Sequence, residues 1–367
     1  MTLWLYIARR FATSVVSIFA VVLFLAILFD ALELGRRAAG VEDIGFANVI
    51  GMAALRAPSI SIKAAPFVML LAAIWTYARL ARSSELVVTR AAGVSAWRIV
   101  APTMVTAALF GVFVTTVYNP VSAALLDRFE RLQAQVFRGD DSLLSVSREG
   151  LWLRQGNFDA QSVIHARDTN SDGTELKQVT IFLFRGTDDF IGRIDADAAS
   201  LRAGFWRLEN AAVRRLDPDD PNAPPSLEEL ASYDLPTDLT ATQIVDSFAA
   251  PETISIWRLY GFIQTLREQG FAARRHRLHW HASLAAPLVF AAMALLGSAF
   301  SMRHARMGGL GIMALWAALT GFAIYFIFDI AQALGGSGVI PPAPAAWGPP
   351  FASLLLAAGL LLHFEDG

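Results

Sequence analysis

The stretch FATSVVSIFAVVLFLAILF, Phe11–Phe29, contains no charged residue and is as long as the apolar core of a bilayer requires. Backbone amides in hydrocarbon must find their partners inside the same segment, so this stretch predicts a membrane-spanning helix. It is too long for a removable signal peptide, and no small-residue cleavage site follows it. The same criteria find five further spans, at about Ala64–Ala78, Ile99–Tyr118, Ala282–Met302, Met307–Phe328 and Ala346–Leu362.

The composition agrees with a membrane protein. Hydrophobic residues make up 55% of the 367 positions and charged residues only 17%, whereas soluble domains carry roughly 25% charged residues. The net charge of −2, with no basic face, argues against a nucleic-acid partner. The chain has no cysteine, which excludes disulfides and thiolate zinc sites.

Cations beside the spans indicate the orientation, because arginine and lysine gather on the cytoplasmic side. The loop expected at Gly335–Pro350 has no charge, whereas Arg36, Arg37, Arg56 and Lys63 go against the rule. The overall alternation predicts that both termini are cytoplasmic and that the stretch between the third and fourth spans lies outside. The cations that carry this prediction are Arg9, Arg10, Arg79, Arg82, Arg90, Arg98, Arg303 and Arg306.

The stretch between the third and fourth spans is polar and reads as short strands bounded by Gly, Asp and Asn turns. This pattern favours an antiparallel sandwich or jelly roll. A Pro/Asp-rich linker, Asp217–Pro225, precedes an amphipathic helix at Ile254–Gln269 that ends at Gly270. The expected strands are Leu143–Ser147, Gly150–Gln155, Ser162–Ala166, Val179–Phe184, Ile191–Asp195, Trp206–Leu208 and Ala212–Leu216.

We therefore expect an α-helical membrane protein of six transmembrane helices, three before and three after an inserted β-jellyroll domain. The first half is 1–120, with helices at about 11–34, 60–80 and 98–120 and a short helix at 83–93. The β domain and its returning helix take 121–275. The second half is 276–367, with helices at about 280–302, 307–333 and 345–363.

The loop after the second span, LARSSELVVTRAAGV at Leu80–Val94, does more than turn the chain. Ser83 or Ser84 can cap a short helix, and Gly93 suits its C-terminal stop. Glu85 lies in the first turn, where the helix dipole favours an anion. Such a capped helix, with a carboxylate at its start, is suited to docking on a soluble partner.

Catalytic chemistry finds little support in these residues. Gly-Lys occurs nowhere, so there is no P-loop for ATP, and no catalytic residue is assigned. His276, His279 and His281 allow a metal site on one helix face, but with Trp280 and the neighbouring arginines they fit a membrane-interface anchor better, and no metal is assigned.

Two further alternatives are weaker. Gly335–Gly338 contains a serine, but no intramembrane histidine is near it in the sequence, so a flexible outside loop is favoured. Asp30, Glu33 and Asp329 lie at the ends of spans, where hydration is easy, rather than at the midplane that proton coupling would need.

Several segments together resemble the LptF/LptG family of lipopolysaccharide export permeases. The resemblance runs in order along essentially the whole chain, and the last segment and the loop motif are more similar to the LptG branch. The segments are SSELVVTRAAGVSAWRI at 83–99, GLWLRQG at 150–156, LPTDLTATQI at 235–244, ISIWRLYGFIQTLREQGF at 254–271 and FDIAQALGGSGVIPPAPAAW at 328–347.

The resemblance implies a permease subunit of an ABC transporter in the bacterial inner membrane, with its β domain in the periplasm. Its partners would be a paralogous LptF-like permease, a homodimeric cytoplasmic LptB-like ATPase, a periplasmic or bitopic LptC-like β-jellyroll protein and an LptA-like bridge protein. Lipopolysaccharide would leave the inner membrane through a cavity between the two permeases. This chain would bind no cofactor, because ATP and Mg belong to the ATPase.

The same resemblance assigns candidate residues. Glu85 matches the acidic residue of the family's coupling helix, which inserts in a groove of the ATPase and meets an arginine there. The first and fifth spans form lateral gates in this family. The coupling surface would be Glu85, Ser84, Leu86, Val87, Thr89 and Arg90, and the gates would offer Phe24, Ile27, Leu28, Ala31, Leu32, Phe322, Tyr325 and Phe326.

Lipid phosphates require cations at the rim of the apolar wall. Relatives can carry lysines in and beyond the first span, where this chain has Ile27 and Glu33, so Arg36 and Arg37 are expected either to take that role or to anchor the interface. An apolar path through the β domain would use Trp152, Ile164, Ile181, Leu183 and Trp206, which in a purely structural domain would simply be core.

Two other kinds of protein stay open. One is a membrane scaffold whose β domain binds a partner without transport. The other is the permease of a different ABC lipid or lipoprotein exporter, although such extractors place the large domain after the first span.

Overall fold

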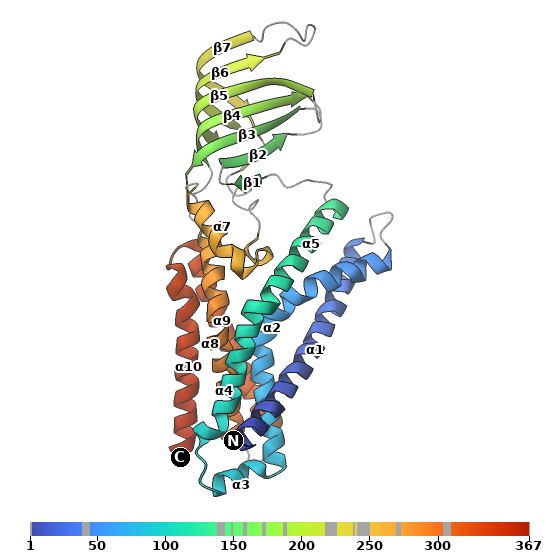
Figure 1. Ribbon diagram of the computed structural model, residues 1–367, viewed down its shortest axis with the longest axis vertical. Coiled ribbons are helices and arrows are strands. Elements are labelled where there is room, and N and C mark those ends of the chain that lie inside the picture. Colours follow the sequence, from blue (N-terminus) through green and yellow to red (C-terminus); the bar gives the residue numbers. More distant parts are fainter. Residues whose placement is uncertain are drawn as a thin grey trace. The chain divides into compact units, whose positions relative to one another are not determined.

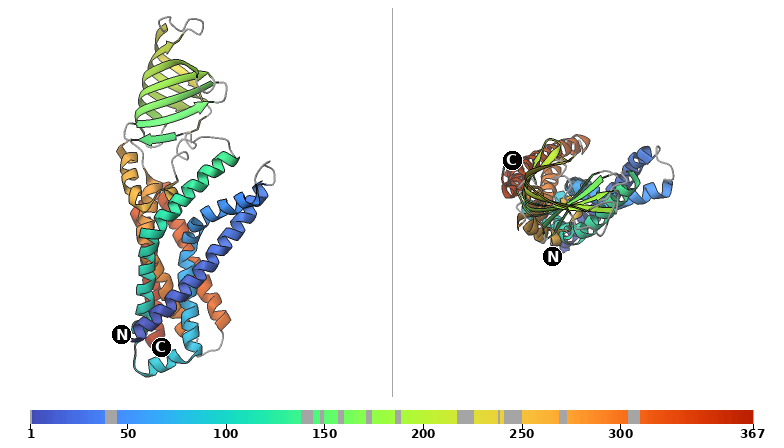
Figure 2. Two further views of the ribbon diagram at one scale, coloured as in Figure 1. Left: turned by 45° about the vertical axis from the view of Figure 1, so that its right-hand side comes forward. Right: turned by 90° about the horizontal axis from the view of Figure 1, so that it is seen from above.

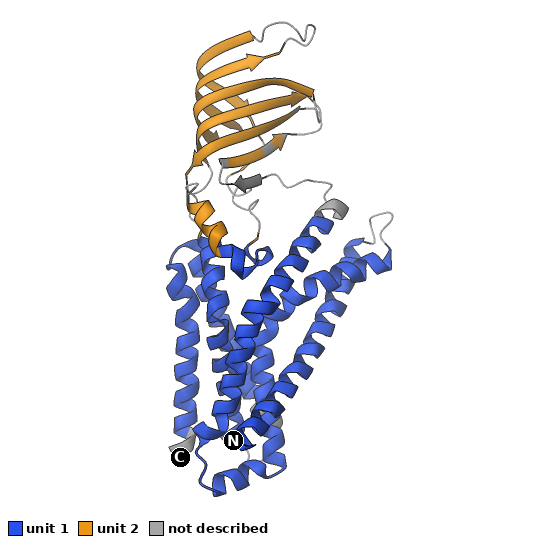
Figure 3. Ribbon diagram, in the orientation of Figure 1, with its two compact units in different colours: residues 1–138, 251–259, 274–367 blue, residues 139–250, 260–273 orange. Residues whose placement is uncertain are grey.

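The computed structural model describes residues 2–38, 45–137, 144–147, 150–156, 160–170, 174–185, 189–216, 226–237, 239–240, 250–268, 273–303 and 310–366. The chain divides into two compact units (Figure 3). The helical unit comprises residues 1–138, 251–259 and 274–367, and the β unit comprises 139–250 and 260–273. An α-helical membrane protein with an inserted antiparallel β domain is thereby confirmed.

Among the described residues, six helices are long and apolar enough to cross a membrane. The third consists of α4 (Ala96–Phe113), a π-helical turn (Val114–Tyr118) and α5 (Asn119–Phe137). In Figure 1, α1, α5 and one half of α2 lean away from α8, α9 and α10. The other five spans are α1 (Thr2–Ala38), α2 (Phe46–Arg82), α8 (Arg274–Arg303), α9 (Leu310–Ser337) and α10 (Pro342–Asp366).

The uncharged loop predicted at Gly335–Pro350 is mostly helical, and that prediction was wrong. Helix α9 continues to Ser337 and α10 starts at Pro342. Gly335 serves close packing, because a Cβ there would lie 2.6 Å from the Cβ of Ala345 on α10. Pro342 stands in the first helical turn, where a missing N–H costs nothing.

A glycine and a proline bring α4 and α8 together at the centre of the helical unit. A Cβ on Gly111 would lie 2.5 Å from the Cα of Pro287, so only glycine allows this backbone approach. Pro287 has no N–H, and the carbonyl of Ser283 one turn earlier therefore lacks its helical donor. The hydroxyl of Thr115 donates to that carbonyl at 2.9 Å.

A second backbone carbonyl lacks its helical donor at Pro120, just after the π-helical turn. Because Pro120 has no N–H, the carbonyl of Thr116 is left without its helical donor, and the indole N–H of Trp257 donates to it at 3.1 Å. The side chain of Asn119 accepts the backbone N–H of Ile256 at 3.0 Å. The turn therefore fastens the start of α7 (Ile256–Glu268) to the third span.

An ion pair ties α1 to α2 at the end of the unit opposite α3 (Glu85–Ala91). Arg56 donates to Oδ1 of Asp30 at 2.9 Å, and its guanidinium also lies 5.4 Å from the ring centroid of Phe129 on α5. Asp30 is only 7% exposed. The expectation of a hydrated boundary carboxylate was wrong for Asp30, because a cation from the next helix takes the place of water.

The β unit contains one seven-stranded antiparallel sheet in which each strand pairs with its sequence neighbour. Figure 2 shows that the sheet is strongly curved. The described strands therefore form a meander, and none of them makes the crossing connection of a jelly roll. The strands are β1 (Leu144–Ser147), β2 (Gly150–Gly156), β3 (Ala160–Thr169), β4 (Glu175–Arg185), β5 (Asp189–Arg202), β6 (Phe205–Arg215) and β7 (Ser226–Pro236).

Two details of the strands were not predicted. The segments expected at Trp206–Leu208 and Ala212–Leu216 belong to one strand, which passes through Asn210 in a left-handed conformation at φ 52°. Strand β7 was missed altogether. Its residues are mostly exposed, so it lacks the apolar alternation that reveals a half-buried strand. The linker Asp217–Pro225 and Gly270 lie outside the described residues.

One face of the sheet forms a closed apolar core. Cross-strand register places Leu153, Ile164, Ile181 and Ile194 side by side on it. Leu266 of α7, 1% exposed, packs into the same cluster. The returning amphipathic helix thus contributes to the core of the curved sheet.

The first prediction concerns the approach of α4 to α8. Gly111→Ala is expected to destabilise the protein by about 1–3 kcal/mol, because a backbone atom blocks the new methyl group and cannot rotate away. Thermal unfolding in detergent measures the change. The matched control is Gly359→Ala in α10, where a Cβ meets nothing within 4 Å. Equal melting temperatures for the two variants would contradict the packing described.

The second prediction concerns the buried ion pair. Arg56→Met is expected to cost about 1–3 kcal/mol, because it leaves the Asp30 carboxylate buried without its donor. Arg37→Met is the control, since Arg37 and its partner Glu33 are both about half exposed. It should cost at most about 0.5 kcal/mol in the same unfolding measurement. A larger loss for Arg37→Met than for Arg56→Met would refute this assignment.

Candidate functional site

Helix α3 stands between α2 and α4 and is only seven residues long. It ends as predicted at Gly93, whose φ of 81° is in the left-handed region. The N–H of Gly93 donates to the carbonyl of Arg90 at 2.9 Å, and the N–H of Val94 to that of Thr89 at 3.4 Å. This pair of bonds is the Schellman arrangement that closes a helix.

The predicted serine cap at the start of α3 was wrong. Ser84 occupies the cap position but has a φ of 61°, and its side chain makes no capping hydrogen bond. The hydroxyl of Ser83 donates instead to Oε1 of Glu85 at 2.8 Å. The serine thus orients the carboxylate rather than the helix backbone.

The exposed side of α3 differs from the predicted coupling surface at two positions. Leu86 is 5% exposed and belongs to the core of the helical unit, so its side chain faces away from solvent. Val87 and Val88 are 60% and 67% exposed. Val88 was not among the predicted residues, although it lies three residues after Glu85 and therefore on the same helix face. Thr89 and Arg90 are partly exposed.

The carboxylate of Glu85 contacts two side chains of α1 in addition to Ser83. The hydroxyl of Tyr6 on α1 donates to Oε2 at 2.7 Å, and Nη2 of Arg10 lies 3.6 Å from Oε1. The hydrogen bond from Tyr6, together with that from Ser83 and the positive charges of Arg10 and Arg79, outweighs partial desolvation and lowers the pKa of Glu85. Glu85 is therefore a charged group at neutral pH, with its side chain 35% exposed.

The predicted gate residues lie on two helices with different neighbours. Helix α1 packs mainly against α2 and α4, whereas α9 packs against α8, α10 and α2. Phe24, Leu28 and Leu32 of α1 are exposed, while Ile27 and Ala31 pack on an apolar cluster with α2 and α5. On α9, Phe322 and Phe326 are exposed, and the ring of Tyr325 lies 4.9 Å from that of Phe67.

The two candidate phosphate-binding arginines have different surroundings. Arg37 donates to the carboxylate of Glu33 at 2.9 Å, one helical turn earlier. Arg36 is exposed, and no described residue forms an ion pair with it. Of these two arginines, Arg36 therefore has the guanidinium without an ion-pair partner among the described residues.

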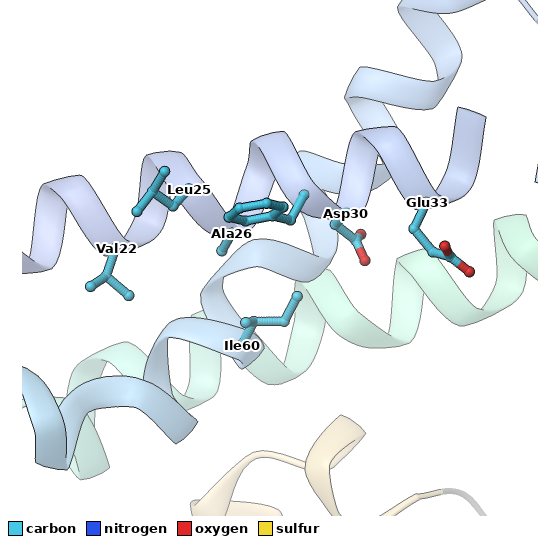
Figure 4. Close-up of a pocket in the computed structure, with 7 residues that line it drawn as sticks. Val22, Leu25, Ala26, Asp30, Glu33 and Ile60 are labelled. Carbon is cyan, nitrogen blue, oxygen red and sulfur yellow. The ribbon is translucent and has the colours of Figure 1, made fainter. Parts of the chain in front are cut away.

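Between α1 and α2 lies an open depression of about 380 Å³ (Figure 4). Its wall is apolar, and Asp30 and Glu33 stand at one end. Oδ2 of Asp30 is buried there without a hydrogen-bond partner. This depression could not be predicted from the sequence, because it depends on how Ile60 of α2 faces α1. The wall consists of Val22, Leu25, Ala26, Phe29 and Ile60.

The predicted path through the β unit is split between the two faces of the sheet. Ile164, Ile181 and Trp206 are fully buried in the core, and Leu183 packs against it. The indole of Trp206 donates to Gln155 at 3.2 Å. Trp152 pairs with His165 in register on the opposite face, and the two ring centroids lie 4.3 Å apart in a tilted arrangement. Grouping Trp152 with the other four was therefore wrong.

Ser337 and the histidines of α8, which carried two weaker alternatives, have ordinary structural surroundings. The hydroxyl of Ser337 donates to the carbonyl of Leu334 at 3.0 Å, as at many helix ends. His276 is buried, and the ring of His281 lies 5.0 Å from that of Trp280. Among the described residues, no three His, Asp or Glu side chains are close enough to share a metal ion.

Comparison with known proteins covers nearly the whole chain. The family described as lipopolysaccharide export system permease LptF/LptG matches residues 5–363. The chain is 27% identical over 293 residues to lipopolysaccharide export system permease protein LptG of Haemophilus influenzae, which covers 79% of this chain and 78% of that protein. It is 25% identical over 306 residues to the protein of the same name from Escherichia coli K12, which covers 81% of each chain.

These matches include the six spans, the α3 loop and the inserted β unit in one continuous alignment with the family. The chain belongs to the LptF/LptG family of lipopolysaccharide export permeases.

Proposed function

We propose that this chain is an LptG-type permease subunit of an ABC transporter that extracts lipopolysaccharide from the inner membrane and passes it to a periplasmic bridge. The family match and the relatives named LptG support this proposal. The observation that carries the transport step is α3, a short helix that presents the charged Glu85 beside the exposed Val87 and Val88.

The energy for transport would come from a separate subunit. The sequence has no Gly-Lys pair, and its only lysines are Lys63 and Lys177, so it offers no P-loop for ATP. In the proposal a homodimeric LptB-like ATPase carries ATP and Mg and receives α3. An arginine in its groove would bond the Glu85 carboxylate, and the two valines would supply apolar contact area.

The helical unit also leaves apolar surface for a second permease. Exposed aromatic and aliphatic side chains occur on α1 and on α9, which have largely different neighbours within the chain. A paralogous LptF-like subunit would complete both faces. Acyl chains would then enter a cavity between the two permeases, and Arg36 would meet a phosphate at its rim.

The β unit would form the first part of the periplasmic route. Its described sheet has β1 and β7 at the edges, and an edge strand can pair with a strand of another β domain. LptC-like and LptA-like partners would extend the sheet in this way. Acyl chains could follow the core face only if Leu266, which packs there, moved away.

Orientation completes the proposal. Arg9 and Arg10 on α1 and Arg79 and Arg82 on α2 lie near α3, which would place this end in the cytoplasm by the positive-inside rule. Both termini would then be cytoplasmic, and the β unit would be periplasmic.

The decisive experiment targets Glu85. Glu85→Ala and Glu85→Arg are expected to deplete the ATPase from the complex or to uncouple hydrolysis from lipid extraction, because they remove the anion that meets the ATPase arginine. Co-purification from native membranes and lipid release by the reconstituted complex measure the two effects. Asp127→Ala is the control, because Asp127 forms an exposed ion pair with Arg131 on α5.

Normal transport by both Glu85 variants would exclude the assigned role of Glu85. Recovery of the wild-type chain with neither an ATPase nor a second permease would favour the scaffold alternative. Wild-type release by Asp127→Ala is expected throughout.

A further prediction separates the two arginines. Arg36→Gln is expected to weaken lipopolysaccharide cross-linking or binding about three- to tenfold, because an uncommitted guanidinium is lost. Arg37→Gln should have the smaller effect, since Glu33 already occupies that guanidinium. Binding of lipopolysaccharide by the purified complex is the measurement, and the reverse order of effects would contradict the assignment.

A further inference from the structure

The Glu85 carboxylate connects α3 to a helix far away in the sequence. Tyr6 and Glu85 are 79 residues apart, and their hydrogen bond is 2.7 Å long. Arg10 stands one helical turn after Tyr6 and approaches the other oxygen of the same carboxylate. We call Tyr6, Arg10, Ser83 and Glu85 the carboxylate clasp.

The members of the clasp support one another. The guanidinium of Arg10 lies 4.6 Å from the ring centroid of Tyr6, which restricts both side chains. Ser83 fixes Oε1 of Glu85 from within the loop, and Tyr6 bonds Oε2 from α1. Hydrogen bonds to a charged carboxylate are stronger than neutral ones, so the link between α1 and α3 is specific even though it is partly exposed.

The clasp leaves hydrogen-bond acceptor sites free on the Glu85 carboxylate. An ionised carboxylate has two acceptor sites on each oxygen. Tyr6 and Ser83 take one site on each, and the side chain is still 35% exposed. A cation from a docked subunit can therefore bond Glu85 while Tyr6 remains bonded to it.

Helix α1 connects the clasp to the lipid-facing surface. It is continuous from Thr2 to Ala38 and contains no proline. The exposed Phe24 lies about 27 Å along the helix from Tyr6, at 1.5 Å per residue. A displacement of α3 that is transmitted to Tyr6 would therefore move the exposed side chains of the same helix.

We propose that Tyr6 and Arg10 are positioning residues that fasten Glu85 to α1, so that movement of α3 by a docked ATPase is passed to the lipid-facing part of α1. This inference rests on the proposed function, because it requires an ATPase that moves α3. It assigns the connection to two side chains of α1, Tyr6 and Arg10.

The test uses the complete transporter in lipid vesicles and two matched variants. Tyr6→Phe removes only the hydroxyl that bonds Glu85 from α1. Ser83→Ala removes a hydroxyl that bonds the same carboxylate from within the loop, and leaves the link to α1 in place. The measured quantity is lipopolysaccharide released per ATP hydrolysed, together with the amount of ATPase recovered in the complex.

Tyr6→Phe is expected to retain the ATPase and its hydrolysis but to lower lipid release per ATP about three- to tenfold. Ser83→Ala, which leaves the link to α1 in place, is expected to lower this ratio less than Tyr6→Phe does. Arg10→Met should lower the ratio as well, and Arg10→Lys, which keeps the positive charge, should restore part of it. A purely structural role would lower the recovery of the complex and leave this ratio unchanged.

A distance measurement gives a second readout. The chain has no cysteine, so Leu5→Cys and Ala91→Cys introduce the only two labelling sites of the permease. Both positions are exposed, on α1 and α3 respectively. Spin labels there are expected to give a narrow distance distribution that shifts little with nucleotide state, and a broader one after Tyr6→Phe.

The outcomes separate this inference from the proposed function. If Glu85→Ala uncouples transport but Tyr6→Phe leaves lipid release per ATP and the label distances unchanged, the clasp inference is overturned and the proposed function stands. If Tyr6→Phe increases ATPase recovery at a normal ratio, the clasp competes with docking and the inference is again overturned. If Glu85→Ala leaves ATPase recovery and export normal, Glu85 has no role in coupling and the clasp inference is overturned with it. If the wild-type chain is recovered with neither an ATPase nor a second permease, the proposed function itself is wrong.

Discussion

Hydrocarbon offers no hydrogen-bond partner to a peptide group, and the interior of the helical unit is organised by that constraint. Several prolines interrupt the helical ladder of the described helices, and at two of them the free carbonyl has a donor on another element. Pro287 leaves the carbonyl of Ser283 free and Pro120 leaves that of Thr116 free, and Thr115 and Trp257 donate to them from other elements. Each repair is also a contact between helices. The bonds that satisfy the backbone therefore fix α8 against α4, and the first residues of α7, Ile256 and Trp257, against the third span.

The same constraint explains what could be predicted from the sequence. Phe11–Phe29 could be assigned to a span from its own residues, since a helix is the only local solution in lipid. Gly335–Pro350 was misjudged because glycine and proline indicate turns in water, whereas Gly335 here allows α9 to approach Ala345. Strand β7 carries no apolar alternation and became visible only through its pairing with β6.

The features of the candidate site also divide into those that are local in the sequence, which could be predicted, and those that depend on distant residues, which could not. Glu85, Val87 and the stop at Gly93 could be identified from a short window, because a helix and its end are local features. The sequence also indicated that Trp152 lies on the outer face of the sheet. Its strand neighbours Leu151 and Leu153 face the core, and side chains alternate along a strand. The partners of Glu85 were not available, since no local pattern indicates that Tyr6 would meet a carboxylate 79 residues later. The burial of Asp30 likewise depended on Arg56, which another helix supplies.

The contacts of α1 with Glu85 and with Arg56 differ in their exposure. The contact of Arg10 with Glu85 is partly exposed at 3.6 Å, and exposed ion pairs contribute little and break easily. Asp30 is buried at the other end of α1, and separating it from Arg56 would leave an uncompensated charge in a site of low polarity. Helix α1 and the neighbouring part of α2 are therefore held together more firmly than α1 and α3. A displacement that reaches α1 through the hydrogen bond from Tyr6 to Glu85 would move this pair of segments together.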